Sequence, residues 1–331
     1  MARFTLTRLA SLVGILLGLS VVVFLLQAVV PADPVRAMVG ASAKPQIVEA
    51  KRHELGLDRP LPAQYAKFLS RAVRGDLQMS LHTRRPVRTD IAAFLPATLE
   101  LAATALAMAV VLGGALGLLT ARGRGTSLRV GLVASASVPG FLLALLLLIV
   151  FYAQLRWFPG SGRISAELEA PTGPTGLLTV DGLLAGRLDV VRDALAHLAL
   201  PALCLALGPA VALGRTLRSS LQTVLSADHI RTARAKGLTE RGVLLRHAVR
   251  PALSAPLTMT GLQVGMLLAG VVVIESIFAW PGLGLYTARA ITSVDFPAIV
   301  GVTLVMGAVY VIVNALVDVA QVAADPRLRA R

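Results

Sequence analysis

Two carboxylates and one amide lie inside long apolar stretches of this chain. Aliphatic residues flank Glu100 and Gln263 on both sides, and Glu275 follows the aliphatic run Val271–Ile274. Ionisable groups inside a membrane segment are costly, and they usually face the protein interior, a water-filled route or a proton pathway. We therefore take Glu100, Gln263 and Glu275 as candidates for a translocation path or its gate. In an ion-coupled secondary transporter, which is one open alternative, Glu100 or Glu275 would carry the proton.

The segment that follows Glu275 predicts a structure at a membrane boundary. Trp280 has the amphipathic ring that anchors at the membrane interface, and Pro281-Gly282 can turn the chain back. We interpret residues 275–285 as a re-entrant or gate-forming outer element, with Trp280 as part of the candidate gate. A simple interfacial anchor is the alternative interpretation.

Other reactive side chains lack a partner at a useful spacing. Ser161 and His197 are the nearest pair for a hydrolase, but nothing in the sequence orients them as nucleophile and base. The five histidines are scattered and Cys204 is the single cysteine, which disfavours a metal centre or a disulfide framework. The glycine-rich segment 123–127 lacks the lysine of a phosphate-binding loop. We expect no catalytic residue, metal or cofactor on this chain, and a hydrolase is the remote alternative.

A basic segment, 228–251, lies between two apolar runs. Ser226 is of the type that caps a helix N-terminus, and Gly237 is of the type that ends a helix in a left-handed conformation. Thr239 is suited to start a second helix, which Pro251 would end or kink. The pattern predicts two short helices hinged at Gly237. A loop that is basic through membrane topology alone is the alternative.

The composition is that of a polytopic membrane protein. Of the 331 residues, 56% are apolar and 15% are charged, and the mean hydropathy is +0.74, which excludes an ordinary soluble domain. Apolar windows of about 20 residues, long enough to cross a bilayer, predict an all-α integral membrane fold. The six predicted transmembrane helices are Leu9–Val30, Phe94–Thr120, Leu128–Leu155, Ala194–Arg215, Ser254–Ala279 and Pro297–Gln321.

The basic residues predict both orientation and partners. The termini, the 122–129 turn and the 215–250 loop carry 16 Lys and Arg residues, whereas the short loops on the other side carry 5. Because short basic loops favour the cytoplasmic side, we expect a multi-pass protein of the cell membrane with both termini cytoplasmic. The net charge of +14 then lies beside the spans, without interleaved aromatic residues, so we expect membrane lipid rather than nucleic acid as a partner.

This topology divides the chain into four parts. They are a cytoplasmic N-terminus with the first span (1–30), an extracytoplasmic insertion (31–93), a core of five further spans (94–321) that includes the cytoplasmic loop 215–253, and a cytoplasmic tail (322–331).

Small residues and prolines within the spans predict how the helices pack. Gly14 and Gly18, Gly113 and Gly117, and Gly261 and Gly265 are each one turn apart, which permits close approach of another helix in this chain or in a second subunit. Prolines 139, 201, 209 and 256 interrupt spans. Kinked helices around a cavity would suit a transporter, and rigid bundle packing is the alternative.

Several motifs in a fixed order carry a resemblance to a known family. Arg231-Thr-Ala-Arg-Ala-Lys-Gly237 with His247-Ala-Val-Arg250 resembles the cytoplasmic EAA loop of ATP-binding-cassette (ABC) importer permeases, in the form typical of the dipeptide/oligopeptide/nickel family. The resemblance is to the first permease subunit of that family and covers essentially the whole chain. The other matching motifs are Glu54–Pro60, Gly75–Leu77, Pro96–Glu100, Gly160–Arg163, Ile274–Gly284 and Asp325–Arg329.

The resemblance implies a fold, a function and partners. The fold would be the type I ABC importer permease fold with an extracytoplasmic insertion between the first two spans. The chain would form half of a peptide-translocation path with a second permease subunit. Two ATPase subunits that bind ATP and Mg²⁺ would drive alternating access, and an extracytoplasmic binding protein or lipoprotein would deliver the substrate. Relatives in this family that carry nickel, haem, opines or glutathione leave the substrate open.

The resemblance also implies that the 215–253 loop docks on an ATPase subunit. The expected coupling residues are Asp228, Arg231, Thr232, Ala233, Arg234, Lys236, Gly237, Leu238, Arg241 and His247. Leu238 would fold back as the apolar contact of the Gly237 turn. The Gly237 hinge and an apolar ridge of Leu238, Val243 and Leu244 would contribute more to docking than the basic side chains. The chain departs from the family pattern at Arg231, which replaces the glutamate that names the motif, and at Pro251, which replaces an asparagine.

Overall fold

The computed structural model describes residues 2–29, 44–56, 58–121, 127, 130–131, 133–134 and 137–324, and its regular secondary structure within them is helical. Within these ranges the only β-type pairing is an isolated bridge between Met79 and Pro86. The predicted all-α class is therefore confirmed. The chain divides into two compact units, residues 1–95 with 286–311 and residues 96–285 with 312–331.

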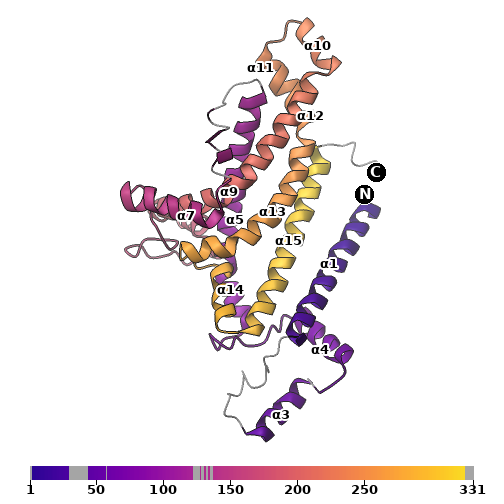
Figure 1. Cartoon of the computed structure of the whole chain (residues 1–331), viewed down its shortest axis with the longest axis vertical. Coiled ribbons are helices and arrows are strands. Elements are labelled where there is room, and N and C mark those ends of the chain that lie inside the picture. Colours follow the sequence, from indigo (N-terminus) through magenta and orange to yellow (C-terminus); the bar gives the residue numbers. More distant parts are fainter. Residues whose placement is uncertain are drawn as a thin grey trace. The chain divides into compact units, whose positions relative to one another are not determined.

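Four helices are long and apolar enough to cross a membrane. They are α5 (Val87–Ala121), α9 (Leu188–Leu225), α13 (Ser254–Ile277) and the part Phe296–Val317 of α15 (Phe296–Ala324). Two shorter apolar helical stretches are Leu12–Leu26 within α1 (Ala2–Val29) and Gly140–Gln154, which comprises α7 (Gly140–Leu147) and the π-helix η1 (Leu148–Gln154). Figure 1 labels these helices, whose length and composition suit a protein with several membrane spans.

Two of the predicted spans differ from the observed helices. The predicted span Ala194–Arg215 is the middle of the 38-residue α9, which continues beyond it at both ends. Pro201 and Pro209 lie inside α9 without ending it, so the predicted interruption at these prolines is wrong. The predicted span Leu128–Leu155 begins in residues that lie partly outside the described ones, and Pro139 precedes the first residue of its described helix, α7.

The first unit contains α1, α3 (Pro45–Leu55), α4 (Leu61–Val73), the start of α5, most of α14 (Leu283–Thr292) and the start of α15. Phe94 of α5 stacks on Tyr286 of α14 with their ring centroids 5.2 Å apart. The hydroxyl of Tyr286 donates to the buried Asp90 carboxylate over 3.1 Å. Aromatic packing and a satisfied buried carboxylate therefore join these two helices.

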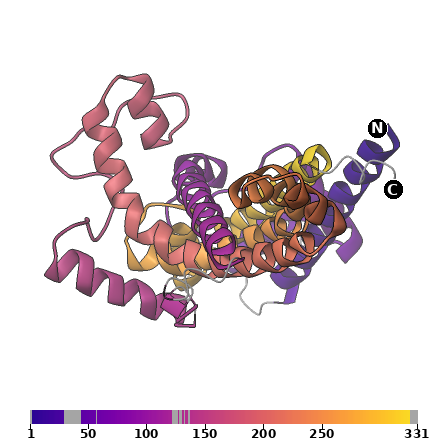
Figure 2. The same cartoon turned by 90° about the horizontal axis from the view of Figure 1, so that it is seen from above.

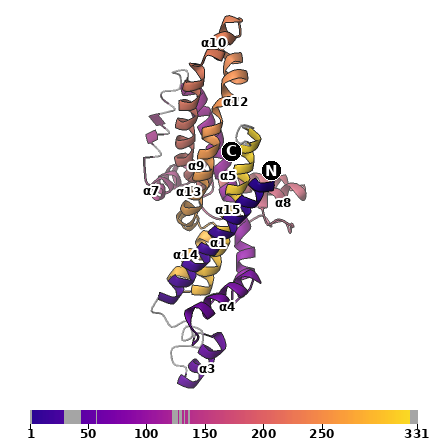
Figure 3. The ribbon, with the colours of Figure 1, turned by 90° about the vertical axis from the view of Figure 1, so that its right-hand side faces the viewer.

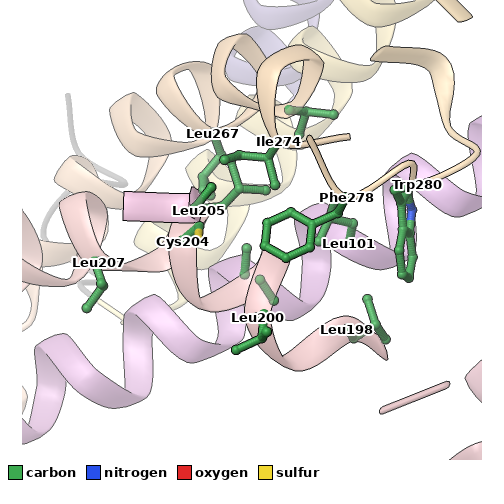
Figure 4. Packing of buried hydrophobic residues seen from close by; sticks show 14 of the residues in the cluster. Leu101, Leu198, Leu200, Cys204, Leu205, Leu207, Leu267, Ile274, Phe278 and Trp280 are labelled. Atoms are coloured by element: carbon green, nitrogen blue, oxygen red, sulfur yellow. The ribbon is translucent and has the colours of Figure 1, made fainter. Parts of the chain in front are cut away.

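The second unit is built on the packing of α9 against α5 and α13. Its core contains leucines of all three helices with Phe278 and Trp280, and Figure 4 shows where these side chains lie on the helices. On α5, a Cβ at Gly113 or Gly117 would collide with Ala210, Leu213 or Leu217 of α9. The predicted close approach at this glycine pair is thus confirmed, and the neighbour belongs to the same chain.

The second unit also contains shorter helices. These are α7, α8 (Leu178–Leu184), α10 (Asp228–Ala235), α11 (Glu240–Gly242), the π-helix η2 (Val243–Ala248) and α12 (Val249–Ala252). Figures 2 and 3 show the chain from two further sides. In Figure 3, α7 and α8 lie on different sides of α9, and α10 and α12 lie near one end of that helix.

Candidate functional site

The basic loop, residues 226–253, begins with a cap that differs from the predicted one. Ser226 ends α9, and its hydroxyl donates to the Thr223 carbonyl oxygen over 2.8 Å. Ala227 occupies the N-cap position of α10 without a side-chain hydrogen bond. The predicted Ser226 cap is therefore wrong, because that hydroxyl already bonds the helix that Ser226 terminates.

The hinge at Gly237 has the predicted conformation. Gly237 has φ +77°, its N–H donates to the Arg234 carbonyl over 2.9 Å, and the Leu238 N–H donates to the Ala233 carbonyl over 3.4 Å. This pair of bonds is a Schellman motif, which satisfies the carbonyl groups at a helix end. A Cβ at Gly237 would meet no described atom within 4 Å apart from its chain neighbours. The requirement for glycine is thus a property of the backbone, not of the space around it.

The second half of the loop also starts as predicted. Thr239 Oγ1 accepts a hydrogen bond from the Gly242 N–H over 3.2 Å, which caps α11. Helical structure then continues through η2 and α12. Pro251 lies in α12, and the helix ends one residue later, before α13 begins at Ser254. The predicted helix end near Pro251 is confirmed.

The loop has an apolar core of its own, which we call the loop core. Its buried members are Leu217, Leu221, Ile230, Ala233, Val243, Leu244, Ala248 and Ala252. Leu238 packs against the loop core, as the predicted hinge contact requires. The predicted docking ridge of Leu238, Val243 and Leu244 is wrong as an exposed surface, because Val243 and Leu244 are buried against α9 and α10. Ala233, an expected coupling residue, is buried there as well.

The other expected coupling residues remain at the surface of the loop. The exposed ones are Asp228, Arg231, Thr232, Arg234, Lys236, Gly237, Arg241 and His247. Leu245 is 62% exposed, and within the described residues 226–253 it is the only exposed large hydrophobic residue.

An ion pair crosses the Gly237 hinge. Arg234 Nε lies 2.8 Å from Glu240 Oε1, and a second bond of 3.3 Å joins the same two side chains. The hydrogen bond to Glu240 raises the pKa of the Arg234 guanidinium above its ordinary value. Because both side chains are exposed to solvent, the pair contributes little to stability. It orients the two short helices and leaves Arg231 and Lys236 on the outer surface of the loop.

Glu275 lies at the opposite end of α13, inside the protein. Its side chain is 0% exposed. Its Oε1 accepts the Thr98 hydroxyl over 2.6 Å, and its Oε2 accepts the Leu285 N–H over 3.0 Å. Thr98 Oγ1 in turn accepts the Leu283 N–H over 2.7 Å. The carboxylate therefore ties the start of α5 to the turn that follows α13.

Gly282 and Gly284 make room for this carboxylate. A Cβ at Gly282 would collide with the Glu275 carboxylate, and a Cβ at Gly284 would lie 2.7 Å from the Val272 backbone. Such a separation is well below ordinary van der Waals contact. The Pro281-Gly282-Leu283-Gly284 sequence thus wraps closely around one buried acidic side chain.

Trp280 is buried close to Glu275 in sequence and is not an interfacial residue. It is 1% exposed, its indole N–H donates to the Ala97 carbonyl over 3.0 Å, and the Arg163 guanidinium lies 5.7 Å from its ring centroid. The predicted interfacial anchor is wrong, because a buried tryptophan with a satisfied N–H belongs to a core. Residues 275–285 form a packed turn that closes the end of α13.

Glu100 is buried a short distance away and has different partners. Its Oε2 accepts Arg163 over 2.6 Å, and its Oε1 accepts both the N–H and the hydroxyl of Thr179, over 2.8 and 2.7 Å. Arg163 also donates to the Gly176 carbonyl over 3.1 Å. The loop between η1 and α9 is therefore fastened to α5 through Glu100. We call Thr98, Glu100, Arg163, Thr179, Glu275 and Trp280 together the carboxylate cluster.

The acidic residue of α8 organises the same loop. Asp181 accepts the Thr175 hydroxyl over 2.8 Å and the Gly176 N–H over 2.8 Å. Burial raises the pKa of the Asp181 carboxyl, but the hydrogen bonds from Thr175 and Gly176 outweigh this effect, so the pKa lies below its ordinary value. Asp181 thereby holds the Gly176 backbone in the place where Arg163 contacts it.

The structure brings together only part of the predicted path residues. Glu100, Glu275 and Trp280 belong to the carboxylate cluster, whereas Gln263 lies half-buried on α13, where its amide is 3.6 Å from Met259 Sδ. Sequence reasoning did not assign roles to Thr98, Arg163 and Thr179. Two of these three could have been found, since Thr98 lies in the Pro96–Glu100 motif and Arg163 ends the Gly160–Arg163 motif.

The possible hydrolase pair is not assembled. His197 is buried with its Nδ1 2.9 Å from the Asp193 carbonyl oxygen, whereas Ser161 is exposed. No hydrogen bond joins these two described side chains, and no group of three or more His, Cys, Asp or Glu residues within the described ranges is placed to hold a metal ion. The geometry thus gives no support to the hydrolase alternative.

Comparison with known proteins identifies the kind of molecule that carries this loop and cluster. Residues 109–330 match the family described as "Binding-protein-dependent transport system inner membrane component". The chain belongs to this family. Residues 1–102 match the corresponding N-terminal family, "Binding-prot-dependent transport system membrane comp, N-term". The basic loop and most of the carboxylate cluster lie in the part that matches the inner membrane component, whereas Thr98 and Glu100 lie in the part that matches the N-terminal family.

Full-length relatives of this binding-protein-dependent permease are known in several bacteria. The chain is 41% identical over 325 residues to the probable D,D-dipeptide transport system permease protein DdpB of Escherichia coli K12, covering 97% of this chain and 96% of the relative. It is 37% identical to the di/tripeptide permease DppB of Pseudomonas aeruginosa and 35% identical to the glutathione permease GsiC of E. coli K12, with 99% of both chains covered in each case. The chain is thus a multi-pass permease component of an ABC transport system, which operates with a binding protein and further ABC components.

Proposed function

We propose that this chain is the first permease subunit of an ATP-driven importer of short peptides. The observation that carries the proposal is similarity over at least 97% of the chain to permeases for D,D-dipeptides and for di- and tripeptides. The chain would pair with a second permease subunit, two ATPase subunits and an extracytoplasmic binding protein or lipoprotein. It would cross the cell membrane six times, with both termini in the cytoplasm and the insertion 31–93 outside.

In this proposal the basic loop docks on one ATPase subunit. Docking would use the exposed face of α10 and the hinge, including Arg231, Thr232 and Lys236, with Leu245 as the apolar contact. The loop core supports this assignment, because it gives the short helices a rigid base on the end of α9. Because Ala233 and Val243 are buried, we propose that they support this base and that exposed residues make the docking contacts.

The helix α13 would transmit motion of the loop to the rest of the permease. It begins directly after the loop and has 24 residues, which corresponds to a length of about 36 Å. Glu275 in its last turn is fastened to α5 through Thr98. We propose that the carboxylate cluster holds this end of the translocation path together, and that Gln263, midway along α13, lines the path.

Uptake by the complete importer tests this function. We expect proteoliposomes that contain both permeases, both ATPases and loaded binding protein to accumulate labelled di- or tripeptide when ATP is supplied, with or without a proton gradient. Omitting ATP should abolish uptake. Uptake that persists without ATP and collapses with the proton gradient would instead support a secondary transporter.

The same assay decides between peptide classes. Glutathione is the alternative substrate to compare with short peptides, because a glutathione permease is 35% identical to this chain over nearly its whole length. Unlabelled dipeptide, tripeptide and glutathione should be compared as competitors at equal concentration. Competition by glutathione alone would contradict the assignment to general short peptides.

Neighbouring leucines of the loop provide a test of docking. Leu245 is 62% exposed and Leu244 is 7% exposed. Leu245→Ser should reduce the amount of ATPase that copurifies with the permease while leaving its thermal unfolding midpoint unchanged. Leu244→Ser should lower that midpoint, because truncating a buried leucine costs about 2–5 kcal/mol. Normal ATPase recovery with Leu245→Ser would remove Leu245 from the docking surface.

A further inference from the structure

The short helix α4 (Leu61–Val73) has two different exposed flanks. Pro62, Ala66, Leu69 and Val73 follow one another at helical spacing and form an apolar stripe, in which Val73 is 80% exposed. The neighbouring stripe, one residue further along the chain, contains two small residues, Ala63 and Ser70, and two basic ones, Lys67 and Arg74. No residue of α4 is fully buried. An exposed apolar stripe beside a basic one is typical of helices that lie in a membrane interface.

A third face of α4 fixes the helix to α1. Tyr65 and Phe68 have ring centroids 5.5 and 5.8 Å from that of Phe24 on α1, and the Tyr65 hydroxyl lies 2.8 Å from Ser20 Oγ. Around Phe24 the other faces of α1 carry exposed aliphatic residues, including Val22 and Leu26. The contacts of Tyr65 and Phe68 with Phe24 therefore place α4 against a helix with exposed aliphatic side chains, which we take as a membrane span.

The start of α15 sets the depth of α4 along the membrane normal. Phe68 and Ala72 line one small cavity together with Pro297 and Val300. Pro297 and Val300 belong to the first turns of α15, whose part Phe296–Val317 is long and apolar enough to cross a membrane. α4 thus lies beside the end of a membrane span, at the level where hydrocarbon gives way to lipid headgroups.

We propose that α4 is a membrane-surface helix whose occupant is the lipid bilayer. The stripe of Pro62, Ala66, Leu69 and Val73 enters the boundary between headgroups and acyl chains, and the exposed Arg74 lies level with the lipid phosphates. In this proposal the insertion 31–93 contacts the bilayer through α4. This inference rests on the proposed topology only in taking α1 as a membrane span.

Spin labels on single cysteines test the position of α4. The background variant is Cys204→Ala, and nitroxide labels are attached to Ala66→Cys and Val73→Cys on the apolar stripe. Ala63→Cys and Ser70→Cys on the neighbouring stripe are matched controls, because all four positions are exposed. The complete importer is reconstituted in liposomes of phosphatidylethanolamine and phosphatidylglycerol, and collision with oxygen is compared with collision with a water-soluble nickel chelate.

The expected result is a reversal between the two stripes. Oxygen collisions should exceed nickel collisions at positions 66 and 73, and nickel collisions should exceed oxygen collisions at positions 63 and 70. Dominant nickel collisions at all four positions would overturn the proposal in favour of an aqueous helix. Low collision rates with both reagents at 66 and 73 would overturn it in favour of a covering protein subunit.

A label on α1 separates this inference from the topology. Val22 is 53% exposed, and a label at Val22→Cys should collide mainly with oxygen if α1 crosses the membrane. Oxygen access at Val22 with nickel access at 66 and 73 would reject the α4 proposal alone. Nickel access at Val22 as well would reject α1 as a span.

Discussion

Replacing Gly237 with valine should abolish ATP-driven uptake while the chain still inserts in the membrane in normal amount. Gly237 has φ +77°, and an L-residue in the left-handed region costs roughly 1–2 kcal/mol, with a β-branched side chain among the least tolerated. A Cβ would meet no described atom within 4 Å beyond its chain neighbours, so the cost arises from the backbone conformation and not from a steric clash. The measurements are peptide uptake and the amount of ATPase that copurifies.

Gly237→Asn is the matched control for this prediction. Asparagine enters the left-handed region more readily than other non-glycine residues and also occurs after helix ends. It should retain most uptake and most ATPase association. If valine and asparagine gave equal, near-normal uptake, the hinge would have no role in coupling. If both abolished uptake equally, side-chain bulk rather than backbone conformation would be the cause.

Replacing Gly282 with alanine should destabilise the protein at the other end of α13. The added methyl group would collide with the Glu275 carboxylate, which is fully buried and hydrogen-bonded to Thr98 and Leu285. Overpacking of this kind costs about 1–3 kcal/mol. We expect a lower thermal unfolding midpoint of the purified importer and a loss of uptake, because Glu275 can no longer join α13 to α5.

Gly208→Ala provides the control for the added methyl group. Gly208 lies in α9, and a Cβ there would meet nothing within 4 Å. The unfolding midpoint should stay unchanged or rise slightly, since alanine is the better helix former. An unchanged midpoint for Gly282→Ala as well would show that the turn after α13 can relax, and that the carboxylate cluster is looser than its contacts indicate.

Several features of the basic loop could be predicted because they depend on residues close together in the chain. The Gly237 turn needs only a left-handed residue and the carbonyl groups of Ala233 and Arg234, and the Thr239 cap needs only the N–H of Gly242. The Ser226 cap was wrong for a reason of the same kind. A serine between two helices can bond either one, and here it bonds the helix that it ends.

The docking ridge and the interfacial tryptophan could not be predicted correctly, because burial depends on distant neighbours. Val243 and Leu244 have the apolar character of an interface, but α9 and α10 of the same chain cover them. Trp280 has the composition of a membrane anchor, but the Ala97 carbonyl and the Arg163 guanidinium contact it. The sequence shows that a side chain is apolar, but not whether its own chain, the lipid or a partner subunit will bury it.

By itself the sequence determined that this is an all-α membrane protein with a capped basic loop, and its ordered motifs indicated a permease of the binding-protein-dependent family. Hydrophobic length and helix capping are local properties, so they can be read along the chain. Only the tertiary structure decided what Glu100 and Glu275 contact. Their partners Arg163 and Thr98 lie 63 and 177 residues away in sequence, and such pairs are chosen by how α5, α13 and the intervening loops pack.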